Sequence, residues 1–111
     1  MGIATAIIDT DEEFQRVLDT PVPVFMLFVS QHCPACADAG PLFTRVASQY
    51  PQIKSMVLDT AETLRRSEVT GTPTLAVYRD GALMETFKGL GPEEDQPQLV
   101  EEIFKRYAEN A

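Results

Sequence analysis

The sequence predicts an α/β fold in which a central mixed β-sheet is flanked by helices on both faces. An unbroken apolar run, Val24–Val29, is typical of a strand that is buried on both faces of a sheet. Segments with strand and helix periodicity alternate along the first half of the chain, which favours parallel pairing there. Near the end, Asp80 and Gly81 separate two strand-like segments and predict an antiparallel hairpin.

The first half of the chain predicts four elements. In order these are a strand, a helix, the central strand and a second helix, over residues 3–8, about 11–18, 24–29 and about 34–50. Thr10 and Glu13 have the spacing of a capping box, which places the start of the first helix at Asp11. Pro34 suits the first turn of the second helix, where its missing N–H would be unpaired anyway.

The second half predicts a strand, a short helix, two hairpin strands and a last helix. These cover residues 53–58, about 60–67, 74–78, 82–87 and about 99–107. Asp59 or Thr60 can cap the short helix. Leu99, Ile103 and Tyr107 recur on one face, which indicates an amphipathic last helix. With 111 residues, we expect one domain over residues 1–111.

Composition and charge disfavour several classes of partner. Nine Lys and Arg against 17 Asp and Glu give a formal charge of −8, which repels nucleic acid and anionic membrane surfaces. The longest mainly apolar run, Val22–Val29, is far shorter than the ~20 residues that span a bilayer. Residues 1–9 lack the basic and apolar regions of an export signal. We therefore expect a cytoplasmic monomer that binds neither nucleic acid nor membranes.

The densest chemical signal is Cys33-Pro34-Ala35-Cys36, which follows the central strand and begins a helix. Residues three apart in a first helical turn lie on one side, so the two thiols would lie within disulfide-forming reach. Cys33 would take the N-cap, where unpaired N–H groups and the helix dipole favour a thiolate over a thiol. We expect Cys33 to be the nucleophile and Cys36, one turn further in, to be the resolving thiol.

Three other uses of the cysteine pair are less favoured. A structural zinc site needs a tetrahedral set of ligands, and the chain adds only His32, which lies too close in sequence to complete it. A purely structural disulfide over so short a loop would contribute little to stability. An iron–sulfur cluster shared between two subunits has no further support in the sequence. We expect no metal and no cofactor beyond the redox-active Cys33–Cys36 pair.

Further motifs are spread along the chain. They comprise the cysteine pair, a proline inside the following helix, a proline that opens a later strand, the hairpin turn and a glycine beyond it: Cys33, Cys36, Pro41, Thr72, Pro73, Thr74, Asp80, Gly81 and Gly89. In combination they resemble the thioredoxin family, over about residues 3–107. The resemblance implies a thioredoxin-like fold in which Pro73 is cis and packs close to the two sulfurs.

The resemblance also implies a function and partners. It implies a thiol–disulfide oxidoreductase that reduces protein disulfides and receives electrons from thioredoxin reductase or another thiol system. The backbone of Thr72 would pair with an extended segment of the substrate. Gly89 would line the groove that holds this segment, where the missing side chain lets a partner approach.

The sequence departs from the best-known thioredoxins around the cysteines. His32 replaces a tryptophan, and as an imidazolium it would stabilise the Cys33 thiolate. Pro34, in the first variable position, is similar to glutaredoxins and to periplasmic oxidants of the same fold. Leu27 stands where many thioredoxins carry a buried aspartate that assists proton transfer at the resolving cysteine. We therefore expect resolution by Cys36 to be slower than in a typical thioredoxin. Two further functions therefore compete with a reductase: a protein-binding module with a secondary redox role, and a more oxidising oxidant or isomerase.

Overall fold

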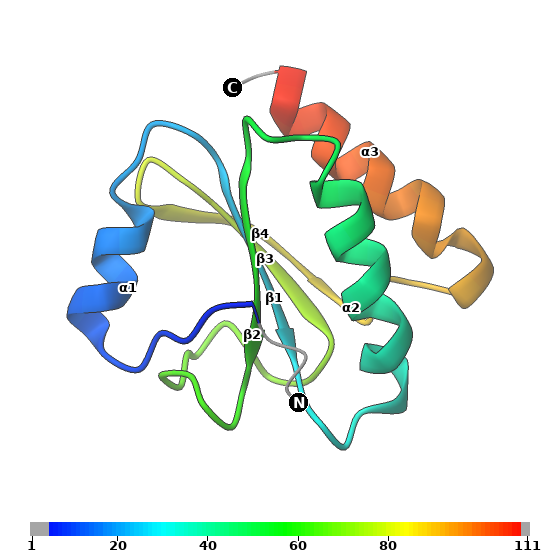
Figure 1. Ribbon diagram of the computed structural model, residues 1–111, viewed down its shortest axis with the longest axis horizontal. Coiled ribbons are helices and arrows are strands. Elements are labelled where there is room, and N and C mark those ends of the chain that lie inside the picture. Colours follow the sequence, from blue (N-terminus) through cyan, green and yellow to red (C-terminus); the bar gives the residue numbers. More distant parts are fainter. Residues whose placement is uncertain (1–4, 110–111) are drawn as a thin grey trace.

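The computed structural model describes residues 5–109 and contains a four-stranded sheet in the order β2-β1-β3-β4 (Figure 1). The strands are β1 (Val24–Val29), β2 (Lys54–Asp59), β3 (Thr74–Arg79) and β4 (Ala82–Lys88). β1 pairs parallel with β2 and antiparallel with β3, and β3 pairs antiparallel with β4. The predicted mixed sheet and its hairpin are confirmed.

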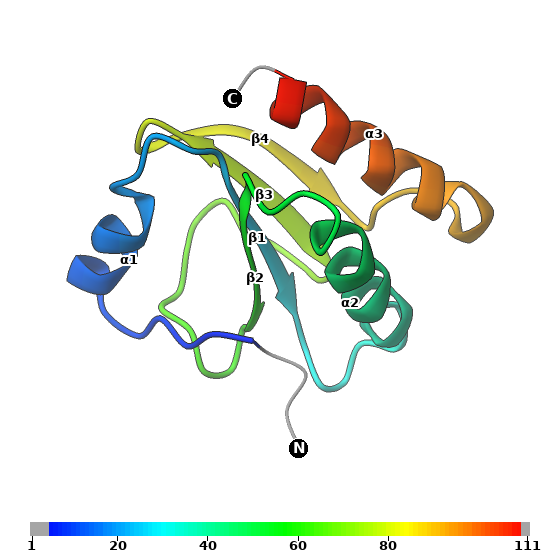
Figure 2. The same ribbon diagram turned by 45° about the horizontal axis from the view of Figure 1, so that its top comes forward.

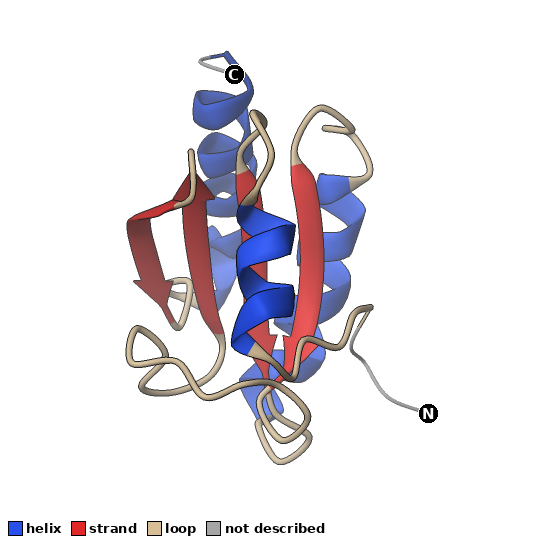
Figure 3. Cartoon of the chain, turned by 90° about the vertical axis from the view of Figure 1, so that its left-hand side faces the viewer, coloured by secondary structure: helices blue, strands red, loops and turns tan. Residues whose placement is uncertain are grey.

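Helices cover both faces of this sheet. They are α1 (Asp11–Leu18), α2 (Pro34–Ala47) and α3 (Gln96–Glu109), and a short 3-10 turn, η1 (Glu93–Asp95), leads into α3. α1 lies on one face, while α2 and α3 lie together on the other (Figures 2 and 3). The predicted three-layer arrangement is therefore confirmed, with one helix on one side and two on the other.

The central strand β1 supplies both hydrophobic cores, because its side chains alternate between the two faces. Phe25, Leu27 and Val29 belong to the core beneath α2 and α3, whereas Met26 and Phe28 belong to the core beneath α1. Each of these side chains is at most 1% exposed. The unbroken apolar run in the sequence therefore follows from burial on both faces.

Aromatic rings join β1 to the two helices on its larger face. The ring centroid of Phe104, from α3, lies 4.5 Å from that of Phe25 and 5.4 Å from that of Phe43, from α2. Ring pairs at these distances stabilise a core beyond the area that they bury. This packing fixes α2, and hence its first turn, against the end of β1.

The strand expected over residues 3–8 is not present in the part that the structure describes. The N–H groups of Thr5 and Ala6 both donate to the Val57 carbonyl, at 2.8 and 3.3 Å. The Val57 N–H donates to the Thr5 hydroxyl at 2.8 Å instead of to a backbone carbonyl. Because the side chain takes this ladder position, the segment follows the edge of β2 without forming a strand; residues 3 and 4 lie outside the described part.

The short helix expected over about 60–67 is also wrong, because this stretch belongs to a loop. Asp59 does accept from the Ala61 N–H, at 2.9 Å, as a helix cap would. The chain then turns away, because the Leu64 N–H donates to the Ile8 carbonyl at 2.8 Å. A contact with a distant segment thus replaces the local helical bond.

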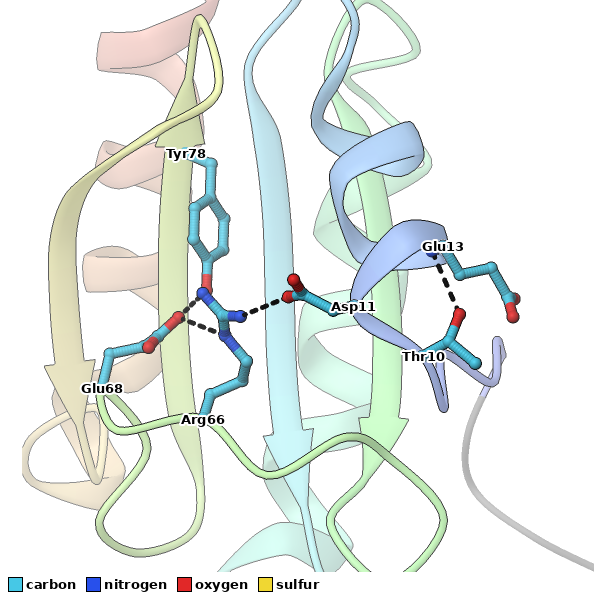
Figure 4. Close-up of polar contacts among 6 residues, drawn as sticks. All are labelled: Thr10, Asp11, Glu13, Arg66, Glu68 and Tyr78. Carbon is cyan, nitrogen blue, oxygen red and sulfur yellow. Dashed lines mark hydrogen bonds and ion pairs between the residues drawn. The ribbon is translucent and has the colours of Figure 1, made fainter.

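Polar side chains anchor this loop to the sheet and to α1 (Figure 4). The Tyr78 hydroxyl donates to Glu68 Oε2 at 2.7 Å, and Arg66 Nε donates to the same oxygen at 3.1 Å. Arg66 Nη1 also lies 3.6 Å from Asp11 Oδ1, and the guanidinium lies 3.9 Å from the centroid of the Phe14 ring. One network therefore holds a loop, a strand and a helix together.

Burial makes this network sensitive to the loss of a partner. Burial and the hydrogen bond to Glu68 raise the pKa of Tyr78 well above its ordinary value. Burial alone would raise the pKa of Glu68, but the bonds from Tyr78, its own backbone and Arg66 outweigh that effect and lower it. The folded state thus favours an ionised Glu68, and this ionisation stabilises the fold. The stabilisation is lost as the pH falls through the lowered pKa of Glu68.

We expect Tyr78→Phe to reduce the free energy of unfolding by about 2 kcal/mol, because it removes a buried hydrogen bond to a charged carboxylate. Urea denaturation measures this loss. Tyr50→Phe is the matched control, since it removes a hydroxyl that donates to Glu101 at 2.7 Å in a more exposed place. A loss with Tyr50→Phe as large as with Tyr78→Phe would contradict the network's role.

We also expect the folded protein to resist ionisation of its tyrosines at pH 10. A hydrogen bond to Glu101 raises the pKa of Tyr50, and burial with a bond to Glu85 raises the pKa of Tyr107 to about 12. The folded state then holds these protons more tightly than the unfolded chain, so the stabilisation is complete below about pH 10 and is lost toward pH 12. Phenolate absorbance, followed with and without urea, measures this. Titration of a tyrosine near pH 10 in the folded state would contradict it.

Candidate active site

The cysteine motif lies where β1 ends and α2 begins. Cys33 is the N-cap of α2 in an extended conformation, with φ −112° and ψ 104°, and Pro34 occupies the first turn. The Cys33 Sγ accepts a hydrogen bond from the Cys36 N–H at 3.2 Å. The sulfur therefore takes the place that the oxygen of a Ser or Asp cap usually takes.

Cys33 and Cys36 form a disulfide, and their Cα atoms lie 5.2 Å apart. The two sulfurs are not equivalent, because Cys33 is half-buried whereas Cys36 is 0% exposed. A partner that approaches from solvent can reach the first cysteine and not the second. Cys36, one turn further into the helix, is therefore the less exposed of the two.

The surroundings of the N-cap favour negative charge on Cys33. The first turn of α2 contains no acidic residue, so none in that turn competes for its N–H groups. The positive end of the helix dipole and the Cys36 N–H both point to the position of the Cys33 sulfur. When the disulfide is open, this geometry stabilises a thiolate there.

The environment of Cys36 is apolar. Cys36 and Leu27 are both fully buried in the core beneath α2 and α3. Leu27 thus fills with hydrocarbon the place where the family resemblance expects an aspartate. The carboxylate that would assist Cys36 is replaced by an apolar side chain.

Pro73 and Gly89 form a second group of predicted site residues. The Thr72–Pro73 peptide bond is cis, as the resemblance implies, and Pro73 is buried. The Gly89 N–H donates to the Pro73 carbonyl at 2.8 Å, which brings the two predicted groove residues together. Thr74 pairs with Phe28 in the antiparallel register, so Pro73 lies opposite the end of β1 that leads to Cys33.

His32 is exposed, and its backbone N–H donates to the Ser30 hydroxyl at 3.4 Å. This contact shapes the turn before Cys33. The structure gives His32 no further hydrogen bond or ion pair among residues 5–109. Its effect on the Cys33 thiolate stays a prediction.

The sequence does not predict a role near the site for two buried polar residues, Gln96 and Asp59. Gln96 Nε2 donates to the carbonyls of Gly89 and Gly91, at 3.4 and 3.1 Å, and so holds the loop that carries Gly89. Asp59 is 2% exposed and accepts from Gln31 Nε2 at 3.2 Å, which joins the end of β2 to the turn before Cys33. An aspartate at the end of an apolar strand was the available signal for Asp59, whereas nothing in the sequence marks Gln96.

Two further properties bear on the class of protein. Within residues 5–109, no group of three or more His, Cys, Asp or Glu side chains is placed to hold a metal ion. None of the helices in that range has the length and apolar character needed to cross a membrane.

Comparisons with known proteins agree with the geometry. The thioredoxin family model matches residues 5–103. Thioredoxin 1 of Synechococcus elongatus is 31% identical over 97 residues, which cover 83% of this chain and 89% of the relative. Fasciola hepatica thioredoxin superposes with a TM-score of 0.76 at 18% identity, covering 93% of this chain and 99% of that one. Mitochondrial thioredoxin 3 of Saccharomyces cerevisiae gives 0.74 at 23% identity, covering 92% and 96%. The chain therefore belongs to the thioredoxin family and is a thiol–disulfide oxidoreductase.

Proposed function

We propose that this protein reduces the disulfides of other proteins, with Cys33 as the attacking thiolate and Cys36 as the resolving thiol. The observation that carries the proposal is the N-cap position of Cys33. Cys33 is half-buried and its sulfur accepts the Cys36 N–H, whereas Cys36 is fully buried. Only one of the two sulfurs is thus both stabilised as a thiolate and open to a substrate.

The exchange takes place in two displacements. The Cys33 thiolate attacks one sulfur of the substrate disulfide, so that a mixed disulfide forms and the other substrate sulfur leaves as a thiolate. Cys36 loses its proton and attacks the Cys33 sulfur, which releases the second substrate thiol. Two electrons pass from the dithiol to the substrate, and the protein is left with the Cys33–Cys36 disulfide.

The second displacement is expected to be slower than in a typical thioredoxin. Cys36 must lose a proton inside an apolar core, where burial disfavours the charged form. Leu27 cannot accept that proton, so water that enters with the substrate, or His32, takes this role.

The loop that ends at the cis proline supports a place for the substrate backbone. Thr72 is half-buried and precedes the buried Pro73, so its backbone can pair with an extended segment by strand addition. Gly89, bonded to Pro73, leaves space beside that segment. Disulfide-containing proteins are the proposed substrates, and a thioredoxin reductase or another thiol system is the proposed electron donor. The cytoplasmic location and the monomeric state stay predictions of the sequence.

We expect Cys36→Ser to accumulate a covalent complex with a disulfide substrate, because Cys33 can still attack but nothing resolves the product. Cys33→Ser should form no such complex. Non-reducing electrophoresis and intact mass measure the complex, and insulin reduction measures turnover, which both variants should lose. Equal turnover in the wild type and the two variants would refute the proposal.

The direction of electron flow is tested by the reduction potential. We expect the Cys33/Cys36 couple to lie nearer the about −270 mV of thioredoxins than the about −120 mV of strong disulfide oxidants. Equilibration with glutathione at several ratios, followed by mass spectrometry of alkylated thiols, gives the value. A reduction potential near that of strong disulfide oxidants would contradict the reductase function and support an oxidant or isomerase instead.

A further inference from the structure

A pocket of about 590 Å³ opens next to the proposed substrate site, which is within the range of ligand-binding pockets. It is lined by Ser30, which follows β1, by Thr60, which follows β2, and by Thr72, which precedes the cis proline. The ends of these strands meet at the edge of the sheet where the dithiol lies (Figure 1). A substrate segment paired with Thr72 would therefore lie over the pocket.

The charge of this pocket differs from that of the whole chain. The formal net charge is −8, yet the described residues that line the pocket include Arg65 and Arg66 and no Asp or Glu. Arg66 is neutralised by Glu68 and Asp11, as described above. Arg65 is exposed and forms no hydrogen bond or ion pair among residues 5–109. The pocket thus keeps one uncompensated positive charge.

The remaining lining suits an acidic side chain. Hydroxyl groups of Ser30, Thr60, Ser67 and Thr70 can donate hydrogen bonds to a carboxylate. The half-buried apolar residues Leu64 and Val69 can cover its methylene groups. Arg65, which has no ion pair among residues 5–109, and these hydroxyl groups can together bind a carboxylate, because charge-assisted hydrogen bonds are the stronger ones.

We propose that this pocket binds an acidic side chain close to the disulfide of the protein substrate, and that Arg65 determines this preference. The inference rests on the proposed function, because it places the reacting disulfide at Cys33. According to this inference, the protein selects partners that carry a negative charge beside the disulfide. It does so although its own net charge is negative and repels them at longer range.

The test uses Arg65→Glu, with Arg45→Glu as the matched control. Arg45 is exposed near the far end of α2 and lines neither the pocket nor the proposed groove. Arg45→Glu changes the net charge by the same amount as Arg65→Glu, but it does so away from the pocket. The substrates are cystine peptides with Asp, Asn or Lys placed in turn at the positions that flank the cystine, together with the uncharged hydroxyethyl disulfide.

At low salt, we expect the wild type to prefer one Asp peptide over its Lys counterpart by about fivefold in kcat/KM, the upper range for an exposed charge pair. The preference should lie in KM and weaken as salt is added. Arg65→Glu should reverse it, whereas Arg45→Glu should keep it. Absence of the preference in the wild type, or an equal change in both variants, would overturn the inference.

The uncharged disulfide separates this inference from the proposed function. The wild type and Arg65→Glu should reduce hydroxyethyl disulfide at the same rate. If the wild type did not reduce it, the proposed reductase function would be contradicted, and the preference for acidic substrates would then be tested by binding alone. A version of the preferred Asp peptide with serines in place of the cystine cannot exchange. In NMR titrations it should shift the backbone amides around Arg65 and Thr72 in the wild type and not in Arg65→Glu. Equal shifts in both proteins would refute the role of Arg65 whatever the redox activity.

Discussion

Burial of β1 on both faces is the constraint on which the other elements depend. Alternate side chains of this strand contribute to the core under α1 and to the core under α2 and α3. An apolar side chain gains about 1.5–3 kcal/mol when it is fully buried, so both layers are held mainly through one strand. Because β1 leads directly into the N-cap of α2, the same packing fixes the position of Cys33.

The irregular segments around the cysteines are held by buried and half-buried polar groups as well as by apolar side chains such as Leu90 and Val69. Gln96 holds the loop at Gly89, Asp59 holds Gln31, and Glu68 holds the loop before Thr72 through Tyr78. Buried polar groups almost always have partners, and here the partners are the segments that surround the site. The groove therefore owes its shape to residues that need not touch the substrate.

Much of the fold and the centre of the site could be predicted because they follow from local patterns. The apolar run of β1, the capping box at Thr10 and the Cys33–Cys36 spacing each act within a few residues. The failures share another cause. Val57 bonds to the Thr5 hydroxyl, and Leu64 bonds to Ile8, so partners far apart in the sequence decide these backbones. Periodicity contains no information about such pairs.

The asymmetry between the two sulfurs has a consequence for the order of events. Two thiolates at this separation would repel each other, and the core around Cys36 excludes the water that would screen them. A buried carboxylate in place of Leu27 would help to remove the Cys36 proton, but it would also bring a further negative charge into that core. With leucine there, the proposed mechanism places the single thiolate of the reduced protein at the helix N-cap. In that mechanism Cys36 loses its proton after the mixed disulfide has removed the charge on Cys33. The apolar replacement would thus tie proton release from Cys36 to capture of a substrate.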